Sequence, residues 1–270
     1  MIRRSDRSGW RSADVQRAEG AARRSFSELG LRHPTEASID AIAYEMGALV
    51  RDVPMAGAVG RLARFKESAI ISVSTAVTFE PRRRWTVAHE LGHLRLHRNQ
   101  SQLQLVTDVS IDDFYDQGVE REANAFASEF LMPAKLWEKQ VDVARPDLDI
   151  VKRLGDEYKV SLQAAAIRFV QLCPERCALV FAKDGRISWF ALGPEFGHWI
   201  EKGMKLDPYS LASDHFKDGR TPGRRESVSA SAWLSGERSY DDEELVEDCV
   251  LIPSLSATLS LLWIRPDSDL

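Results

Sequence analysis

The sequence has few cysteines, no long apolar stretch and no excess of basic residues. Three cysteines in 270 residues, an odd number, favour a reducing compartment over a disulfide-stapled secreted scaffold. The arginine-rich N-terminus lacks the apolar core of a signal peptide, and no run is long enough to cross a membrane. A formal net charge of -5 argues against nucleic acid as the main partner, because nucleic-acid-binding domains usually carry a basic surface. We therefore expect a cytoplasmic protein with no membrane association.

The length and the apolar content set the number of domains. A chain of 270 residues that is 44% hydrophobic can build one large domain or two modest ones. The composition changes near Pro174. We therefore predict an N-terminal arm and helix at residues 1–34, a central domain at residues 35–173 and a C-terminal domain at residues 174–270.

One stretch carries recognisable chemistry, His89-Glu90-Leu91-Gly92-His93. Residues four apart lie on the same face of a helix, so His89 and His93 can present their imidazoles to one point. Two imidazoles at this spacing, with a glutamate after the first, are typical of two zinc ligands and the general base of a metallopeptidase. The predicted cofactor is therefore Zn²⁺, and Glu90 is the predicted catalytic base. Gly92 leaves room for another segment to approach the helix closely.

A catalytic zinc ion needs a third protein ligand. His97 lies roughly 12 Å from His89 along a helix axis, too far to share one ion, which favours a role in packing or in support of another ligand. A second helix follows, with two glutamates on opposite sides of an apolar face made of Val119, Ala123, Phe126, Ala127 and Phe130. Glu120 lies on the side with the small alanines, where two helices can pack closely around an ion. We predict Glu120 as the third ligand and Glu122 as a salt-bridging residue.

These two motifs together resemble the ImmA/IrrE family of bacterial zinc metallopeptidases. The resemblance runs through residues 84–97 and then through Glu120-x-x-Ala-Asn-x-Phe-Ala to Leu-Met-Pro at residues 131–133, and it covers roughly residues 36–172. It implies a zincin-like fold and a zinc site at His89, His93 and Glu120. It also implies a cytoplasmic endopeptidase whose substrate is a helix-turn-helix transcriptional repressor, with cleavage relieving repression in a stress response or on induction of a mobile element.

The rest of the central domain fits an α+β fold. Helices are expected from about residue 13 to Gly30 and after Pro34, and a small antiparallel sheet from three strands at residues 48–53, 58–65 and 69–77. Residues 148–172 read as two helices around a short turn, the arrangement of a DNA-binding helix-turn-helix. The second of these helices has too few hydrogen-bond donors for base or phosphate contacts. We therefore predict a packing or substrate-docking unit.

The C-terminal domain shows a different pattern, also of the α+β class. Residues 178–192 predict a β-hairpin turning at Asp184-Gly185. Helices are expected at residues 195–203 and 208–217, and strands at residues 227–234, 245–252 and 258–264. In relatives with a sensor module, such a domain has been likened to GAF domains. The resemblance therefore makes it a candidate for binding a small molecule or other signal, in a regulatory or docking role.

Two other functions stay open at this point. The protein could be a non-proteolytic anti-repressor that sequesters its partner and uses the zincin fold as a scaffold. It could also be a DNA-binding regulator that uses the turn within residues 148–172, in which case its affinity for DNA should fall steeply with salt.

Overall fold

A computed structural model describes most of the chain. The described residues are 13–65, 68–97, 104–106, 118–219, 225–236, 240, 243–266, 268 and 270. The N-terminal arm predicted before residue 13 lies outside them. The chain divides into two compact units, Met1–Pro133 with Asp156–Ser161 and Ala134–Gly155 with Leu162–Leu270. The domain boundaries proposed from the sequence stay a prediction.

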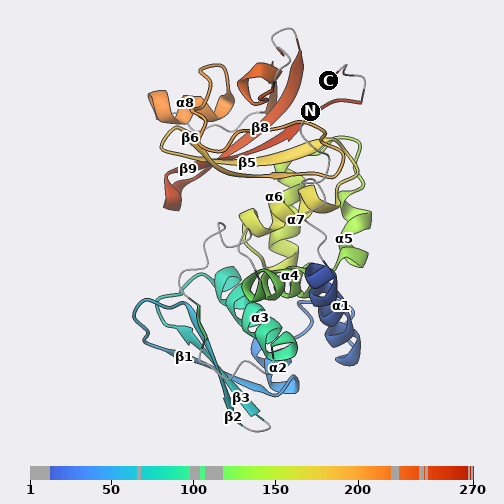
Figure 1. Cartoon of the computed structure of the whole chain (residues 1–270), viewed down its shortest axis with the longest axis vertical. Helices are drawn as coiled ribbons and strands as arrows, with labels where there is room; N and C mark the ends of the chain where they lie inside the picture. The colour runs from blue at the N-terminus through green and yellow to red at the C-terminus, as the bar shows by residue number, and fades with distance from the viewer. Residues whose placement is uncertain are drawn as a thin grey trace. The chain divides into compact units, whose positions relative to one another are not determined.

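The first unit combines helices with a small sheet (Figure 1). Its helices are α1 (Ala13–Glu28), α2 (Ile39–Glu45), α3 (Glu80–Leu96) and α4 (Val119–Leu131). Its strands are β1 (Ala48–Val53), β2 (Gly60–Phe65), β3 (Ser68–Ser74) and β4 (Gln104–Val106). Ser38 caps α2 by accepting a hydrogen bond from the Ala41 amide at 3.2 Å.

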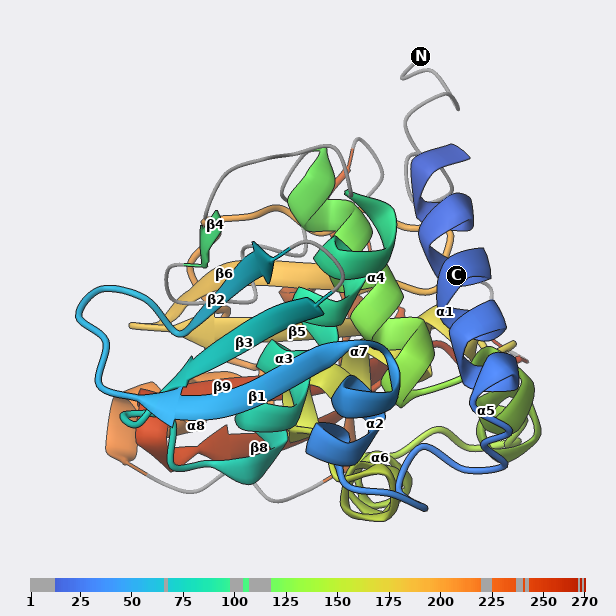
Figure 2. The ribbon, with the colours of Figure 1, turned by 90° about the horizontal axis from the view of Figure 1, so that it is seen from below.

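The four strands lie in the order β1-β3-β2-β4 (Figure 2). Strands β2 and β3 form a tight antiparallel hairpin in which Phe65 pairs with Ser68. The expectation of a wholly antiparallel sheet is wrong for one pair, because β1 runs parallel to β3. The hairpin partner β2 already occupies one edge of β3. Strand β1 therefore joins the opposite edge, and the chain crosses over to reach β2.

Helix α3 is the most enclosed element of this unit. Every residue from Arg84 to His93 is buried, because the helix contacts β2 and β3 on one side and α1, α2 and α4 on the others. Its first turn is fixed by Arg83, which donates hydrogen bonds to Asp40 of α2 at 2.8 Å and to Asp52 of β1 at 3.0 Å. A helix held on all sides can position polar side chains that a surface helix would leave mobile.

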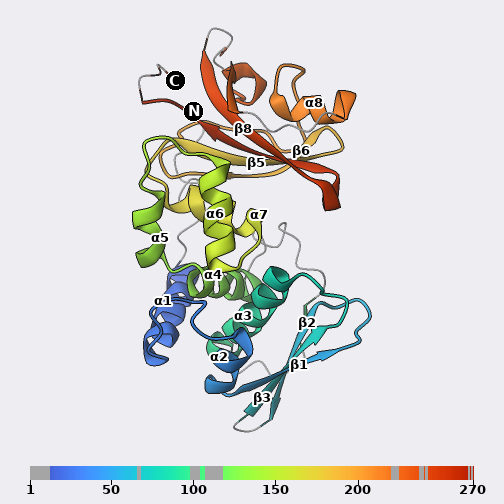
Figure 3. The same cartoon turned by 180° about the vertical axis from the view of Figure 1, so that it is seen from behind.

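The second unit is built on an antiparallel sheet with helices on both faces. Its helices are α5 (Ala134–Val141), α6 (Leu148–Tyr158, whose last three residues belong to the first unit), α7 (Leu162–Leu172) and α8 (Leu211–Asp218). Its strands are β5 (Cys177–Lys183), β6 (Arg186–Leu192), β7 (Arg225–Ser229), β8 (Glu244–Ile252) and β9 (Ala257–Trp263), in the order β6-β5-β9-β8-β7. Helix α7 covers one face and α8 the other (Figure 3). The predicted α+β fold class is thus confirmed.

The predicted hairpin of this unit is confirmed at its turn. Asp184 and Gly185 join β5 to β6 with φ angles of 52° and 71°, as a type I′ turn requires. The helix predicted at residues 195–203 is wrong. Turns lie at residues 194–195 and 202–203, Gly197 has a φ of 75°, and Trp199 forms an isolated bridge to Ser235, so this segment is irregular. The proposed GAF-like character and ligand binding stay predictions.

No helix among the described residues is both long enough and apolar enough to cross a membrane.

One buried carboxylate ties the second unit together. Glu247 of β8 is fully buried and accepts four hydrogen bonds. They come from the backbone amides of Leu211 and Ala212 at 2.9 and 3.0 Å, from the Trp233 indole at 2.9 Å and from the Ser260 hydroxyl at 2.9 Å. Burial raises the pKa of Glu247, and the four hydrogen bonds oppose that rise. The carboxylate therefore links the start of α8 to two strands and to the segment before β8.

We expect Glu247→Gln to destabilise the second unit by about 1–3 kcal/mol. Each carboxylate oxygen accepts two hydrogen bonds. The amide nitrogen of glutamine in place of Oε1 could donate to the Ser260 hydroxyl, but the Ala212 amide would lose its acceptor, and in place of Oε2 it would leave both Leu211 and Trp233 without one. The measurement is the thermal and urea unfolding of the full chain. The control is Glu244→Gln, which makes the same change at an exposed position of the same strand and should shift stability by about 0.5 kcal/mol or less. Equal melting of both variants would contradict the central role of Glu247.

Candidate metal centre

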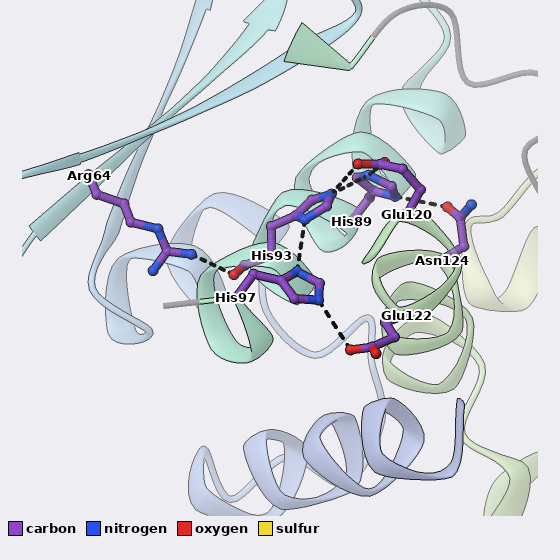
Figure 4. Close-up of polar contacts among 7 residues, drawn as sticks. All are labelled: Arg64, His89, His93, His97, Glu120, Glu122 and Asn124. Carbon is purple, nitrogen blue, oxygen red and sulfur yellow. Dashed lines mark hydrogen bonds and ion pairs between the residues drawn. The ribbon is translucent and has the colours of Figure 1, made fainter. Parts of the chain in front are cut away.

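Two helices bring three potential metal ligands to one point (Figure 4). Helix α3 supplies His89 and His93, and α4 supplies Glu120. The two Nε2 atoms lie 3.0 Å apart, His89 Nε2 lies 3.1 Å from Glu120 Oε2, and His93 Nε2 lies 3.4 Å from Glu120 Oε1. Among the described residues, this is the group of His, Cys, Asp and Glu side chains that could hold a metal ion.

The spacing of these atoms fits zinc. Ligands bound at 2.0–2.2 Å around a tetrahedral zinc ion lie roughly 3.3–3.6 Å from one another. The observed separations of 3.0, 3.1 and 3.4 Å need only small adjustments to reach that geometry. Two imidazoles and one carboxylate are also a donor set that catalytic zinc sites use, with a fourth position left for water.

Hydrogen bonds on the far side of each imidazole fix how the rings face. His89 Nδ1 lies 2.8 Å from Asn124 Oδ1, which can only accept, so Nδ1 carries the proton and Nε2 offers a lone pair to the centre. His93 Nδ1 lies 3.0 Å from His97 Nδ1. Burial lowers the pKa of both His93 and His97, which favours neutral rings with one donor and one acceptor each.

The electrostatics of the group favour a cation, because the Glu120 carboxyl is held in its charged form. Burial works against a charge on Glu120, but its hydrogen bonds to His89 and His93 outweigh this and hold the pKa of the carboxyl well below its usual range. Burial also lowers the pKa of His89, but hydrogen bonding to Glu120 and the negative charge of Glu90 outweigh it, so the net shift is upward. The site thus attracts positive charge in an otherwise buried position.

Glu90 lies beside the centre and is itself fully buried. Neither of its carboxylate oxygens accepts a hydrogen bond from any residue that the structure describes. Burial raises its pKa to about 7. Strand β2 encloses it at Gly60, where a Cβ atom would lie 2.9 Å from Glu90 Oε1. Burying a carboxylate without hydrogen-bond partners costs free energy, so such a group is a candidate for a functional role. A base with a pKa near 7 suits proton transfer at neutral pH.

Close packing of the two ligand helices depends on Gly92. A Cβ atom at this position would lie 3.0 Å from the Cα atom of Ala123 and 3.1 Å from its carbonyl oxygen. The glycine therefore lets α4 approach α3 closely enough for Glu120 to reach the two histidines, which is the room that the sequence pattern predicted for Gly92.

Some contributing residues were not found by sequence reasoning. Asn124 lies one turn after Glu120 on α4, and that four-residue spacing was the available signal. Arg64 of β2 donates hydrogen bonds to the carbonyl oxygens of His93 at 2.5 Å and Leu94 at 3.3 Å, at the C-terminal end of α3 (Figure 4). No local pattern indicated that contact. Glu122 was expected to form a salt bridge, and it pairs with Arg17 and His97 instead of the centre.

A comparison with protein families matches the central part of the chain. The profile of the peptidase M78 family, described as the IrrE N-terminal-like domain, matches residues 43–170. The chain carries an IrrE N-terminal-like domain. The resemblance to the ImmA/IrrE family is therefore confirmed, and the IrrE-like domain has a zincin-like fold.

Two further comparisons add less. A solved structure of a Mycobacterium tuberculosis transcriptional regulator is similar with a TM-score of 0.56 and 15% sequence identity, over 95% of this chain and 79% of that one. At this identity the likeness shows a shared fold alone. A comparison with curated proteins gave no match.

We expect Gly92→Ala to destabilise the metal-free IrrE-like domain and to weaken zinc binding. Alanine gains about 1 kcal/mol in helix propensity, but overpacking against the Ala123 backbone costs about 1–3 kcal/mol and displaces α4 with Glu120. The control is Gly20→Ala in α1, where the nearest atom to a new Cβ is a flexible Arg24 nitrogen at 3.5 Å and only the propensity gain remains. Melting temperature and zinc titration test both variants. If Gly92→Ala has the same melting temperature and zinc affinity as Gly20→Ala, the contact between α3 and α4 can accommodate a Cβ atom and the prediction is wrong.

Proposed function

We propose that this protein is a zinc-dependent endopeptidase that cleaves a helix-turn-helix transcriptional repressor. The observation that carries the proposal is the pairing of two features in the IrrE-like domain. Three ligand atoms lie close to the spacing of a tetrahedral zinc site, and beside them lies the buried carboxylate of Glu90. A structural zinc site would need a fourth protein ligand and would have no use for an adjacent base.

The residues divide the work of peptide hydrolysis between them. His89, His93 and Glu120 would hold the ion, which when bound would supply a water molecule of lowered pKa and polarise the scissile carbonyl. Glu90 takes a proton from the attacking water and delivers it to the leaving amine. Burial between β2 and α3 keeps bulk water from Glu90, so the carboxylate stays basic enough to accept that proton.

Two arguments support the choice of substrate, the family resemblance and the burial of helix α7. The structurally similar Mycobacterium protein is itself named a transcriptional regulator, which fits a role in regulation. Helix α7 would be the recognition helix of a DNA-binding alternative. It is buried from Ala164 to Val170 and contacts α5, β5 and β6, so it offers no free face for a DNA groove. A repressor protein is therefore favoured over DNA as the direct partner.

We expect Glu90→Gln to keep bound zinc and to lose repressor cleavage by a factor of about 10²–10⁴. The substrate to use is the small helix-turn-helix regulator encoded in a neighbouring reading frame, incubated with the zinc-loaded protein. Mass spectrometry of the products identifies the bond that is cut. The control is Glu80→Gln, the same change at an exposed position in the first turn of α3, which should cleave at the wild-type rate.

The outcomes separate the candidate functions. Cleavage by Glu90→Gln at near the wild-type rate would show that Glu90 is not the base. A stable complex with intact repressor would indicate a non-proteolytic anti-repressor. Sequence-specific DNA binding that weakens steeply with salt would indicate a DNA-binding regulator.

We expect Glu120→Ala to lose zinc on dialysis, because the two histidines alone leave a catalytic site one ligand short. Glu122→Ala should still contain zinc after the same dialysis, since this carboxylate contacts His97 and Arg17 and not the centre. Elemental analysis of the dialysed proteins gives the answer. The reverse pattern would move the third ligand to Glu122.

A further inference from the structure

A chain of polar side chains leads away from the proposed metal site toward α1. His93 Nδ1 contacts His97 Nδ1 at 3.0 Å, His97 Nε2 contacts Glu122 Oε2 at 3.1 Å, and Glu122 pairs with Arg17 (Figure 4 shows the chain as far as Glu122). The side chains of His97 and Glu122 are only 5% and 10% exposed, while that of Arg17 is 56% exposed. The chain therefore runs from the buried centre to the surface through three elements, α3, α4 and α1.

The chemistry of the members gives this chain a direction. A histidine that offers Nε2 to a metal must carry its proton on Nδ1, so His93 donates to His97. His97 accepts at Nδ1 and therefore carries its own proton on Nε2. That proton points at Glu122, whose carboxylate can only accept. Each contact thus selects the tautomer that makes His93 a ligand, and the charge of Arg17 keeps the carboxylate in place.

The two histidine ligands are supported differently. His89 is supported by a neutral amide oxygen of Asn124 on the adjacent helix. His93 is supported by an imidazole that is itself polarised by a carboxylate, which makes the His93 ring a stronger electron donor. Because Glu122 lies on the same helix as Glu120, the contact also fixes the rotation of α4 that brings Glu120 to the centre.

We propose that His97, Glu122 and Arg17 are positioning residues that fix the tautomer of His93 and thereby strengthen metal binding. This inference rests on the proposed zinc site. It assigns to α1, at the start of the chain, a part in metal affinity that the two ligand motifs alone do not contain. None of the three residues belongs to the group of potential metal ligands.

The experiment measures the zinc dissociation constant of the full chain by competition with a chromophoric chelator. We expect His97→Leu to raise this constant about 10–100-fold, because His93 loses its acceptor. His97→Gln should bind within about threefold of wild type, since its amide oxygen can accept from His93 and its amide nitrogen can donate to Glu122. Glu122→Gln should fall between the two, because it keeps an acceptor for His97 and removes the charge.

The chain offers a matched control in Glu129. This residue lies seven positions further along α4, its side chain is 1% exposed, and it pairs with Arg23 of α1 at 3.3 Å. Glu129→Gln thus also loosens a buried contact between α1 and α4, and it should leave zinc affinity unchanged. If Glu129→Gln and Glu122→Gln weaken zinc binding equally, the effect comes from packing between α1 and α4, and the proposal is overturned.

The remaining outcomes also decide. Proton–nitrogen correlation spectra of the zinc-loaded wild type should place the proton of His93 on Nδ1 and that of His97 on Nε2. The opposite tautomer of His97, or a His97→Gln protein as weak as His97→Leu, overturns the proposal. If wild type binds zinc and cleaves its substrate while His97→Leu binds zinc equally well, this inference alone fails. If wild type does not bind zinc, the proposed function fails with it.

Discussion

The contact between α3 and α4 at Gly92 is the constraint on which the candidate site depends. The ligands come from two helices whose backbones must approach closely, and the absence of one Cβ atom permits it. The backbone of Ala123 fills the space that a side chain at Gly92 would need. A larger residue at position 92 would push α4 away and separate Glu120 from His89 and His93. The ion pairs and hydrogen bonds of the centre can form only because the backbones of α3 and α4 approach closely at Gly92.

Helix α3 contributes side chains to the site from more than one face. Neighbouring elements cover each of these faces, so ten consecutive residues of the helix are buried. One face presents the two histidines to α4. Another face carries Glu90, whose carboxylate lies so close to the backbone of Gly60 in β2 that a Cβ atom at Gly60 would not fit. At the end of the helix, Arg64 binds the carbonyl oxygens and His97 turns toward Glu122. The histidines and the carbonyl oxygens at the helix end are thereby paired, whereas both carboxylate oxygens of Glu90 and the Nε atoms of Arg84 and Arg95 have no hydrogen-bond partner among the described residues.

Local spacing explains what sequence analysis could recover. His89 and His93 are four apart on one helix, so their convergence follows from helix geometry alone. Placing Glu120 at the centre needed only the position of small residues on α4. The support given by Arg64 and Arg17 joins segments far apart in the sequence, and no periodicity encodes such contacts. The parallel pairing of β1 was missed for the same reason, because neighbouring strands and not local propensity decide it.

All three proposed ligands lie in the first compact unit and none in the second. A metal that binds the folded state alone adds RT ln(1 + [metal]/Kd) to the stability of the unit that holds it. At a hundredfold excess over the dissociation constant this is about 2.7 kcal/mol. An ion bound by the proposed ligands would also join residues 89 and 120 and close a loop of chain between two helices, as a disulfide would. Metal supply would then be a thermodynamic variable that acts on one half of the molecule, and the resistance of that half to proteolysis would follow the zinc concentration around it.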